Sequence, residues 1–249
     1  MVRLRPVLAA LGVLLMAGAG QAAEVTLLSS TAMREPLEAL VPEFERATGH
    51  KVVLRFESSG VLPARIRDGV RADLVVTTPV TLVELGQEHR VRADRMVGFT
   101  RSRVGVAVRA GAPKPDISTV AAFKATLLAA RSVGISKGPS GVHMRGVLKR
   151  LGIAEQIEAK AVVTEFGQRV GVEVAEGRAE IGIQQLTELL ATPGIEVVGP
   201  LPPQLQVEII YAIAPMPDAR QPPAADALVQ YLRSPAVVPV LQRMGLDPA

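Results

Sequence analysis

Residues 56–79 read FESSGVLPARIRDGVRADLVVTTP and hold two strand-to-helix transitions in succession. A β-rich run, Lys51–Phe56, ends in the small polar turn Glu57-Ser58-Ser59-Gly60, and a short helix is predicted from there to Ile66. The run Ala72–Thr78 predicts another strand, and Pro79 then opens a helix at the position that proline tolerates best. A repeated order of strand, short polar turn and helix predicts an α/β fold.

The same unit recurs on both sides of this stretch. The strand-like Val25–Leu28 precedes Ser29-Ser30-Thr31, which we expect to cap a helix that Gly49 ends. Farther along, a strand at Ser132–Ile135 precedes the small-residue loop Ser136–Gly141 and another helix. The remaining predicted strands are Arg103–Val108, Ala161–Val163, Ile181–Gln184 and Val207–Ala214. The remaining predicted helices begin at Ser118 or Thr119, at Val170, at Ala224 and at Val237.

Composition narrows the class of protein. The 249 residues are 48% hydrophobic, which is ample for a packed core, and contain no Cys, which excludes disulfides, thiolate metal sites and cysteine nucleophiles. The formal net charge is +4, from 28 Lys and Arg against 24 Asp and Glu, and aromatic residues make up 3%. Because basic residues are spread along the chain with few aromatics beside them, we expect no nucleic-acid partner.

The first 23 residues, MVRLRPVLAALGVLLMAGAGQAA, have the three parts of a secretory signal peptide. Arg3 and Arg5 form the basic region, a short apolar stretch follows, and small residues precede a cleavage site after Ala22 or Ala23. The apolar stretch is too short for a membrane span, which needs about 20 residues. We therefore expect an exported periplasmic protein, without a lipid anchor because no Cys stands at the cleavage site.

The polar turns predict a binding site for an anion. A helix N-terminus offers unpaired backbone N–H groups and a partial positive charge, and Ser or Thr hydroxyls add donors without formal charge. In an open α/β sheet such turns gather at the carboxyl ends of the strands, where ligands bind. Plain helix capping is the alternative for each turn taken singly.

Enzyme signatures are missing from the sequence. We find no nucleophile elbow, P-loop, HExxH motif or dinucleotide fingerprint. The three histidines, His50, His89 and His143, are far apart, and only His143 follows a candidate turn closely enough to reach a cleft. We expect no catalysis and no cofactor or metal ligand.

From Glu24 onward the chain resembles the periplasmic substrate-binding proteins of ABC transporters, and among them the molybdate-binding type. The resemblance rests on the stretch quoted above and on GPSGVHMRGVLKRLGIAE (138–155), AEGRAEIGIQQLTELL (175–190) and ALVQYLRSPAVVPVLQRMGLDP (227–248). It implies the α/β, two-lobed periplasmic binding protein fold of type II with two crossing segments. The implied division is residues 24–104 plus 211–249 for lobe one and 105–210 for lobe two, after the signal peptide at 1–23.

The resemblance also implies a ligand site between the lobes. Carried over to this chain, its ligand-binding residues are Ser29, Ser30, Thr31, Ser58, Ser59, Thr77, Thr78, Ser136, Ser140, Gly167, Gln168 and Gln185. Gln185 stands where molybdate binders often have Tyr, the first turn is about two residues shorter than usual, and Lys137, Arg145 and Arg169 lie near turns that the family often leaves neutral. An added cation would suit a carboxylate or phosphonate as well as a tetrahedral oxyanion.

The resemblance thus implies a monomeric solute-binding protein that captures an oxyanion such as molybdate or tungstate. Closure of the lobes would hide the anion and present a surface to a membrane permease, with no chemistry on the ligand. Two alternatives stay open: a binding protein for a small organic carboxylate or phosphonate, and a sensory module that presents its ligand to a receptor.

Overall fold

The computed structural model describes residues 22–249, and the predicted signal peptide lies outside the described residues except for Ala22 and Ala23. The strands are β1 (Glu24–Ser30), β2 (Lys51–Glu57), β3 (Leu74–Thr77), β4 (Val97–Arg109), β5 (Val133–Ser136), β6 (Ala161–Thr164), β7 (Ile181–Gln185), β8 (Ile195–Pro200), β9 (Glu208–Pro215) and β10 (Leu246–Pro248). The α-helices are α1 (Arg34–Thr48), α2 (Leu62–Arg67), α3 (Pro79–Gln87), α4 (Val120–Ala129), α5 (Pro139–Arg150), α6 (Ala154–Glu158), α7 (Val170–Ala175), α8 (Leu186–Leu190), α9 (Pro222–Leu232) and α10 (Val238–Arg243), and four short 3₁₀ helices lie at Thr31–Met33, Ala93–Arg95, Pro203–Leu205 and Pro235–Val237.

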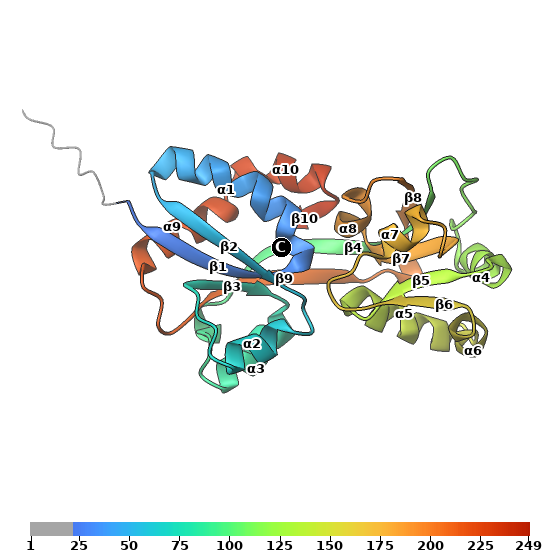
Figure 1. Ribbon diagram of the computed structural model, residues 1–249, viewed down its shortest axis with the longest axis horizontal. Helices are drawn as coiled ribbons and strands as arrows, with labels where there is room; N and C mark the ends of the chain where they lie inside the picture. Colours follow the sequence, from blue (N-terminus) through green and yellow to red (C-terminus); the bar gives the residue numbers. More distant parts are fainter. Residues whose placement is uncertain (1–21) are drawn as a thin grey trace, which may run out of the picture.

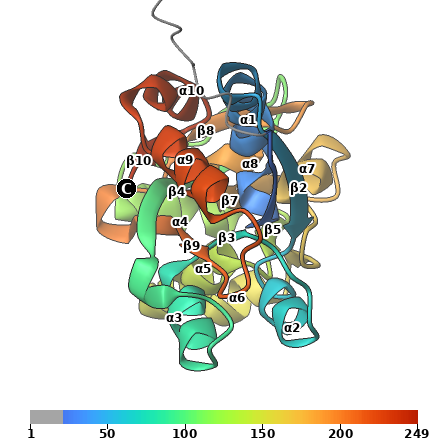
Figure 2. The same ribbon diagram turned by 90° about the vertical axis from the view of Figure 1, so that its left-hand side faces the viewer.

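The first lobe is built on a sheet with the strand order β2-β1-β3-β9-β4. β1 pairs in parallel with β2 and with β3, so the carboxyl ends of these three strands lie at one edge. β9 runs antiparallel between β3 and β4, and β10 pairs with β4 at Thr100–Ser102. Helices α1, α9 and α10 cover one face of this sheet, and α2 and α3 cover the other (Figures 1 and 2).

The second lobe holds β5 to β8 and helices α4 to α8 (Figure 1). β5 pairs in parallel with β6 and β7, and β7 and β8 run antiparallel to β4. β4 is therefore shared: it pairs with β9 up to Arg103 and with β7 from Val104 onward. The predicted α/β fold of two lobes with crossing segments is confirmed, whereas the predicted lobe boundaries remain a prediction.

Burial of one helix face explains why α1 packs where it does. Met33, Leu37, Leu40, Val41 and Phe44, which the sequence places on one face, are all at most 5% exposed. The helix ends at Gly49, as predicted, in the left-handed conformation (φ 76°) that glycine adopts without strain. Pro42 lies inside α1, which continues through it to Thr48.

Some predicted local features are wrong. Ser29-Ser30-Thr31 does not cap a helix: Ser29 and Ser30 complete β1, Thr31 starts a 3₁₀ helix, and no side chain caps α1. The predicted strand at Arg103–Val108 is the second half of a 13-residue strand, because pairing with β9 extends it backward. The edge strands β8 and β10 and the short helices α6 and α8 were not predicted. In residues 22–249 no helix combines the length and apolar character that crossing a membrane requires.

Candidate functional site

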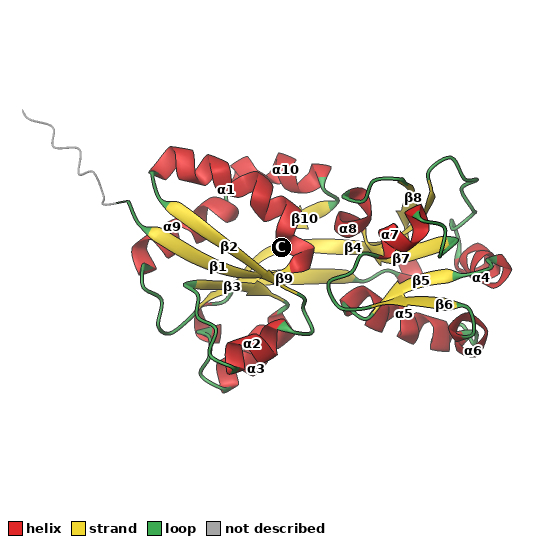
Figure 3. Cartoon of the chain, in the orientation of Figure 1, coloured by secondary structure: helices red, strands yellow, loops and turns green. Residues whose placement is uncertain are grey.

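A small cavity lies between the lobes, where the carboxyl ends of parallel strands from both sheets meet. The loop after β2 and the loop between β6 and α7 face each other there (Figure 3). The cavity has a volume of about 30 Å³. Its lining residues are Thr31, Ala32, Ser58, Ser59, Ser136, Gly138, Pro139, Ser140, Glu165, Phe166, Gly167, Gln168, Gln184, Gln185 and Glu188.

The first lobe contributes uncharged groups. Thr31 follows β1, and Ser58 and Ser59 follow β2. The Ser59 hydroxyl lies 2.7 Å from the hydroxyl of Ser30, at the end of β1. No side chain caps α2, which begins after Val61, so Ser58 and Ser59 are not occupied as helix caps. Their hydroxyls are consequently placed to donate to a guest in the cavity.

The second lobe contributes a matching turn after β5. The hydroxyls of Ser136 and Ser140 lie 3.3 Å apart, and Gly138 precedes α5 without a side-chain cap. Helix capping accounts for one hydroxyl at one predicted turn, where Thr78 Oγ1 accepts from the Thr81 N–H at 3.5 Å. At the other three turns the hydroxyls are not spent on capping, which favours the ligand-site interpretation over the capping one.

A carboxyl group faces these donors from the second lobe. Glu188, in α8, accepts hydrogen bonds from the side-chain amides of Gln184 at 2.8 Å and Gln185 at 3.2 Å. Gln184 Oε1 accepts from the backbone N–H of Val170 at 2.8 Å, and Gln185 Oε1 accepts from the phenol of Tyr211 at 3.1 Å. Both amides are therefore fixed with their NH₂ groups toward Glu188.

Burial shifts the pKa values of two residues in this part of the site. Burial raises the pKa of Glu188 to about 7, although the charge of Arg169 and the hydrogen bond from Gln185 act in the opposite direction. Burial also raises the pKa of the Tyr211 phenol, and the negative charge of Glu188 adds to this shift. Near neutral pH, Glu188 therefore exists in both protonation states, whereas Tyr211 stays a neutral donor.

Direct contacts hold the two lobes together around the cavity. Arg169, just before α7, pairs with Glu35 in the first turn of α1 and donates to the Ala191 carbonyl at 3.1 Å. The ring of Phe166 lies so close to Gly60 that a Cβ there would overlap it. These contacts join the two lobes beside the cavity.

The structure brings most of the predicted site residues together. Eight of the twelve line the cavity: Thr31, Ser58, Ser59, Ser136, Ser140, Gly167, Gln168 and Gln185. Four do not line it: Ser29, Ser30, Thr77 and Thr78. Ser30 supports Ser59, whereas Thr77 is fully buried with its hydroxyl unpaired and Thr78 caps α3. Which of them contact a ligand remains a prediction.

The cationic residues near the turns do not line the cavity. Lys137 pairs with Glu165 at 2.6 Å, Arg169 pairs with Glu35, and Arg145 is not among the lining residues. His143 is held elsewhere too, with Nε2 2.7 Å from the Leu205 carbonyl oxygen. Among the described residues no group of three or more His, Asp or Glu side chains is placed to hold a metal ion.

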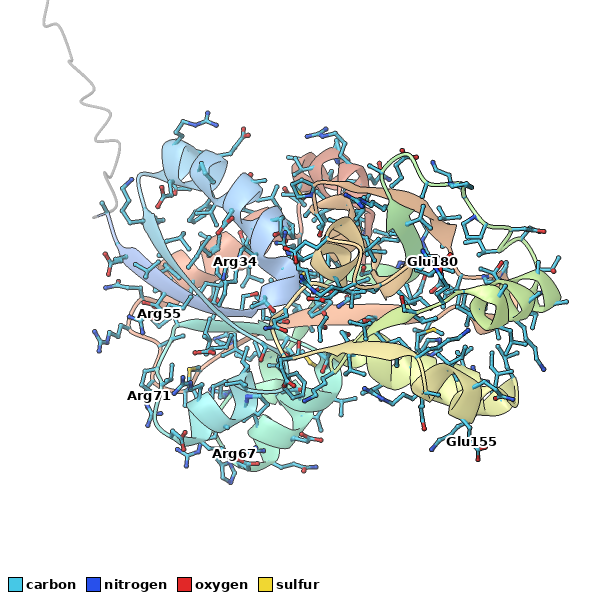
Figure 4. All side chains as sticks on the ribbon, turned by 45° about the vertical axis from the view of Figure 1, so that its right-hand side comes forward. Arg34, Arg55, Arg67, Arg71, Glu155 and Glu180 are labelled. Carbon is cyan, nitrogen blue, oxygen red and sulfur yellow. The ribbon has the colours of Figure 1, made fainter. Side chains whose placement is uncertain are left out.

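Several charged residues lie far from the cavity. Figure 4 shows Arg55, Arg67 and Arg71 at the outer end of the first lobe and Glu155 at the outer end of the second. Arg67 pairs there with Glu88 at 2.6 Å. The charges at or near the cavity are therefore Glu188 and the pairs Arg169–Glu35 and Lys137–Glu165.

Sequence reasoning missed Glu35, Gln184, Glu188 and Tyr211. Glu188 follows Gln185 by three residues, a helical spacing that would have indicated its position had α8 been predicted. Tyr211 reaches Gln185 from β9. No local pattern signals this contact, because the two residues lie on different strands and are 26 positions apart in the sequence.

The chain belongs to a family of bacterial extracellular solute-binding proteins, which it matches over residues 25–247. It is 37% identical over 250 residues to a protein from Pseudomonas sp. named aconitate isomerase, covering 96% of this chain and 95% of the relative. It is 28% identical over 247 residues to the molybdate-binding protein ModA of Azotobacter vinelandii, covering 95% and 94%.

Solved structures agree on the fold. The Azotobacter vinelandii periplasmic molybdate-binding protein superposes with a TM-score of 0.75 at 19% identity, covering 89% of this chain and 98% of that one. The fold is thus that of the type II periplasmic binding proteins, and the resemblance to molybdate-binding proteins is confirmed.

Proposed function

We propose that the protein is a periplasmic binding protein that captures a small anion between its lobes and delivers it to a membrane permease. The observation that carries the proposal is the cavity between strand ends, where Ser58 and Ser59 of one lobe face Ser136 and Ser140 of the other. Uncharged donors match the oxygens of an anion without the desolvation cost of a paired charge. A tetrahedral oxyanion such as molybdate or tungstate is the first candidate.

A thermal-shift panel tests this proposal. The mature chain, from residue 23 or 24, is heated alone and with molybdate, tungstate, sulfate, cis-aconitate or trans-aconitate. A ligand at 100 times its Kd stabilises a protein by about 2.7 kcal/mol, which gives a clear rise in melting temperature. Stabilisation by molybdate or tungstate supports the first candidate, and no stabilisation by any of the five anions would count against anion capture.

A second candidate function is isomerisation of an unsaturated polycarboxylic acid. It is favoured by Glu188, a carboxyl that lines the cavity with a pKa near 7 and so suits proton transfer at neutral pH. The name of the relative with 37% identity points the same way. Conversion of cis-aconitate to trans-aconitate, followed by proton NMR, would support this function, and its absence with bound aconitate would limit the protein to binding.

A further inference from the structure

Glu188 is the cavity carboxyl that lacks a counter-charge. Two carboxyl groups line the cavity, and the other one, Glu165, is paired with Lys137. Arg169, the nearest cation acting on Glu188, is itself paired with Glu35. Within residues 22–249, no Lys or Arg forms an ion pair with Glu188. An ionised Glu188 therefore leaves one uncompensated negative charge where an anion would enter.

Glu188 is also held in place. Its two oxygens accept from Gln184 and Gln185, whose amides are fixed in turn by the Val170 N–H and the Tyr211 phenol. Turning the carboxyl away from the cavity would break both hydrogen bonds and leave buried amide donors unpaired. Rotation of the Glu188 carboxyl would therefore cost more free energy than its protonation in place as a way to relieve repulsion by an anion.

We propose that anion capture by this protein is coupled to the uptake of one proton by Glu188. This inference rests on the proposed function, capture of a small anion. The step is an acid–base equilibrium: a proton from solvent adds to one carboxylate oxygen, and the resulting hydroxyl faces the anion as a donor. When the lobes open and the anion leaves, the proton returns to solvent.

The other titratable groups around Glu188 do not supply this proton. Helix α8 packs against β4, β7, β8 and α7, and the phenol of Tyr211 on β9 stays protonated because its pKa is raised. The charged residues on the packed elements are paired elsewhere or exposed: Glu173 pairs with Arg178, Glu196 with Lys114 and Arg101 with Glu208, while Arg103 and Arg109 are exposed. Of the carboxyl groups at or beside the cavity, Glu165 is paired with Lys137 and Glu35 with Arg169, which leaves Glu188 as the one without an ion-pair partner among the described residues.

The direction of the effect follows from linkage. A negative guest favours the protonated form, so binding raises the pKa of Glu188 above its value of about 7 in the empty protein. Below pH 7 the proton is already bound, and affinity is insensitive to pH. Above pH 7 each anion must bring a proton with it, so Kd rises by about tenfold per pH unit.

Calorimetry tests the coupling directly. The mature protein is titrated with molybdate, sulfate and trans-aconitate at pH 5.5 and pH 8 in two buffers with different ionisation enthalpies, which yields the number of protons taken up. We expect close to one proton per anion at pH 8, close to none for molybdate and sulfate at pH 5.5, and, with further titrations at pH 7, a Kd about fivefold weaker at pH 8 than at pH 7.

Two variants assign the proton to its residue. Glu188→Gln keeps the shape and carries no charge, so we expect no proton uptake and a Kd that does not change between pH 7 and pH 8. Glu155→Gln is the control, because Glu155 is exposed at the outer end of the second lobe, far from the cavity (Figure 4), and we expect it to keep the proton uptake. Circular dichroism establishes that both variants are folded.

The outcomes separate the two proposals. Binding by the unaltered protein with no proton uptake and a flat Kd between pH 7 and pH 8 would overturn the coupling and leave anion capture standing. Uptake that persists in Glu188→Gln would overturn the assignment to Glu188. No binding of any probe at either pH would overturn anion capture, and the coupling with it.

Discussion

The two walls of the cavity differ in chemistry. The first lobe offers Thr31, Ala32, Ser58 and Ser59, none of which carries a charge. The second lobe offers hydroxyls of the same kind at Ser136 and Ser140, and adds amides and two carboxyl groups. If the protein captures an anion as proposed, we expect the first wall to accept any small anion with oxygen acceptors and the second wall to set the selectivity and the pH dependence.

The largest expected effect comes from the turn that shapes the second wall. A Cβ at Gly141 would overlap the carbonyl oxygen of Ser136, so Gly141→Ala must displace the Ser136 turn or the start of α5. We expect a loss of about 3 kcal/mol in the free energy of unfolding, measured by urea denaturation. Gly146→Ala in the same helix is the control, since its nearest neighbour would be 3.7 Å away, and we expect no destabilisation there.

A negative charge placed on the first wall, which carries none, is expected to weaken anion binding. Ser59→Asp places a carboxylate beside Ser30 at the cavity and should weaken anion binding by about 100-fold or more at pH 8. Calorimetry measures the change. The same substitution at the exposed Ser118 is the control, and unaltered binding by Ser59→Asp would mean that the anion does not contact the first wall.

Removing the ion pair between Arg169 and Glu35, which joins the lobes, is expected to have an effect of intermediate size. Arg169→Ala leaves Glu35 without its partner, with a buried oxygen that already lacks a hydrogen bond. We expect about tenfold weaker binding and a larger radius of gyration in X-ray scattering. Arg169 also lowers the pKa of Glu188, so its removal raises that pKa and moves the onset of pH dependence to higher pH.

The matched control for this pair lies far from the cavity. Arg67 forms an exposed ion pair with Glu88, so Arg67→Ala should change neither the anion Kd nor the radius of gyration. An Arg169→Ala protein that behaves like Arg67→Ala would show that the pair does not hold the lobes closed.

The smallest expected effect comes from removing the hydrogen bond that holds Gln185 in the second wall. Tyr211→Phe removes the phenol that donates to Gln185 Oε1 and leaves that oxygen buried without its donor. We expect a loss of about 1 kcal/mol in stability and a several-fold weaker Kd, as the Gln185 amide becomes free to turn. Melting temperature and calorimetry measure the two effects, and an unchanged Kd would show that Gln185 does not depend on Tyr211.

The sequence predicted polar turns in both walls but missed Gln184 and Glu188 of the second. Ser58 and Ser59 follow a strand directly, and a polar turn after a strand is a local pattern that can be read from the chain. Glu188 lies in a five-residue helix too short to show a period, and its place at the cavity depends on how β7 pairs with β4. Acidic residues on helices are usually solvated, which is why this one was overlooked.

Most of the fold was predictable because buried strands also show a local pattern in the sequence. Strands such as β3 and β7 are continuous buried runs, so they are visible from composition alone. β8 and β10 were missed because both are partly exposed and pair only with β4, and β10 has only three residues. The capping predicted for Ser29–Thr31 failed because the paired strand β1 extends through Ser30, beyond the predicted end at Leu28.

The position of β9 constrains the order in which the chain can assemble. β9 is the strand that joins β3 to β4, yet it is made after every strand of the second lobe. The second sheet has all its strands once residue 200 has emerged, whereas β1 to β3 wait for residue 215 before they are joined to β4. Because such distant pairings form slowly, we expect the first sheet to be joined to β4 late in folding, and the Tyr211 phenol that holds Gln185 in the second wall arrives with the same strand.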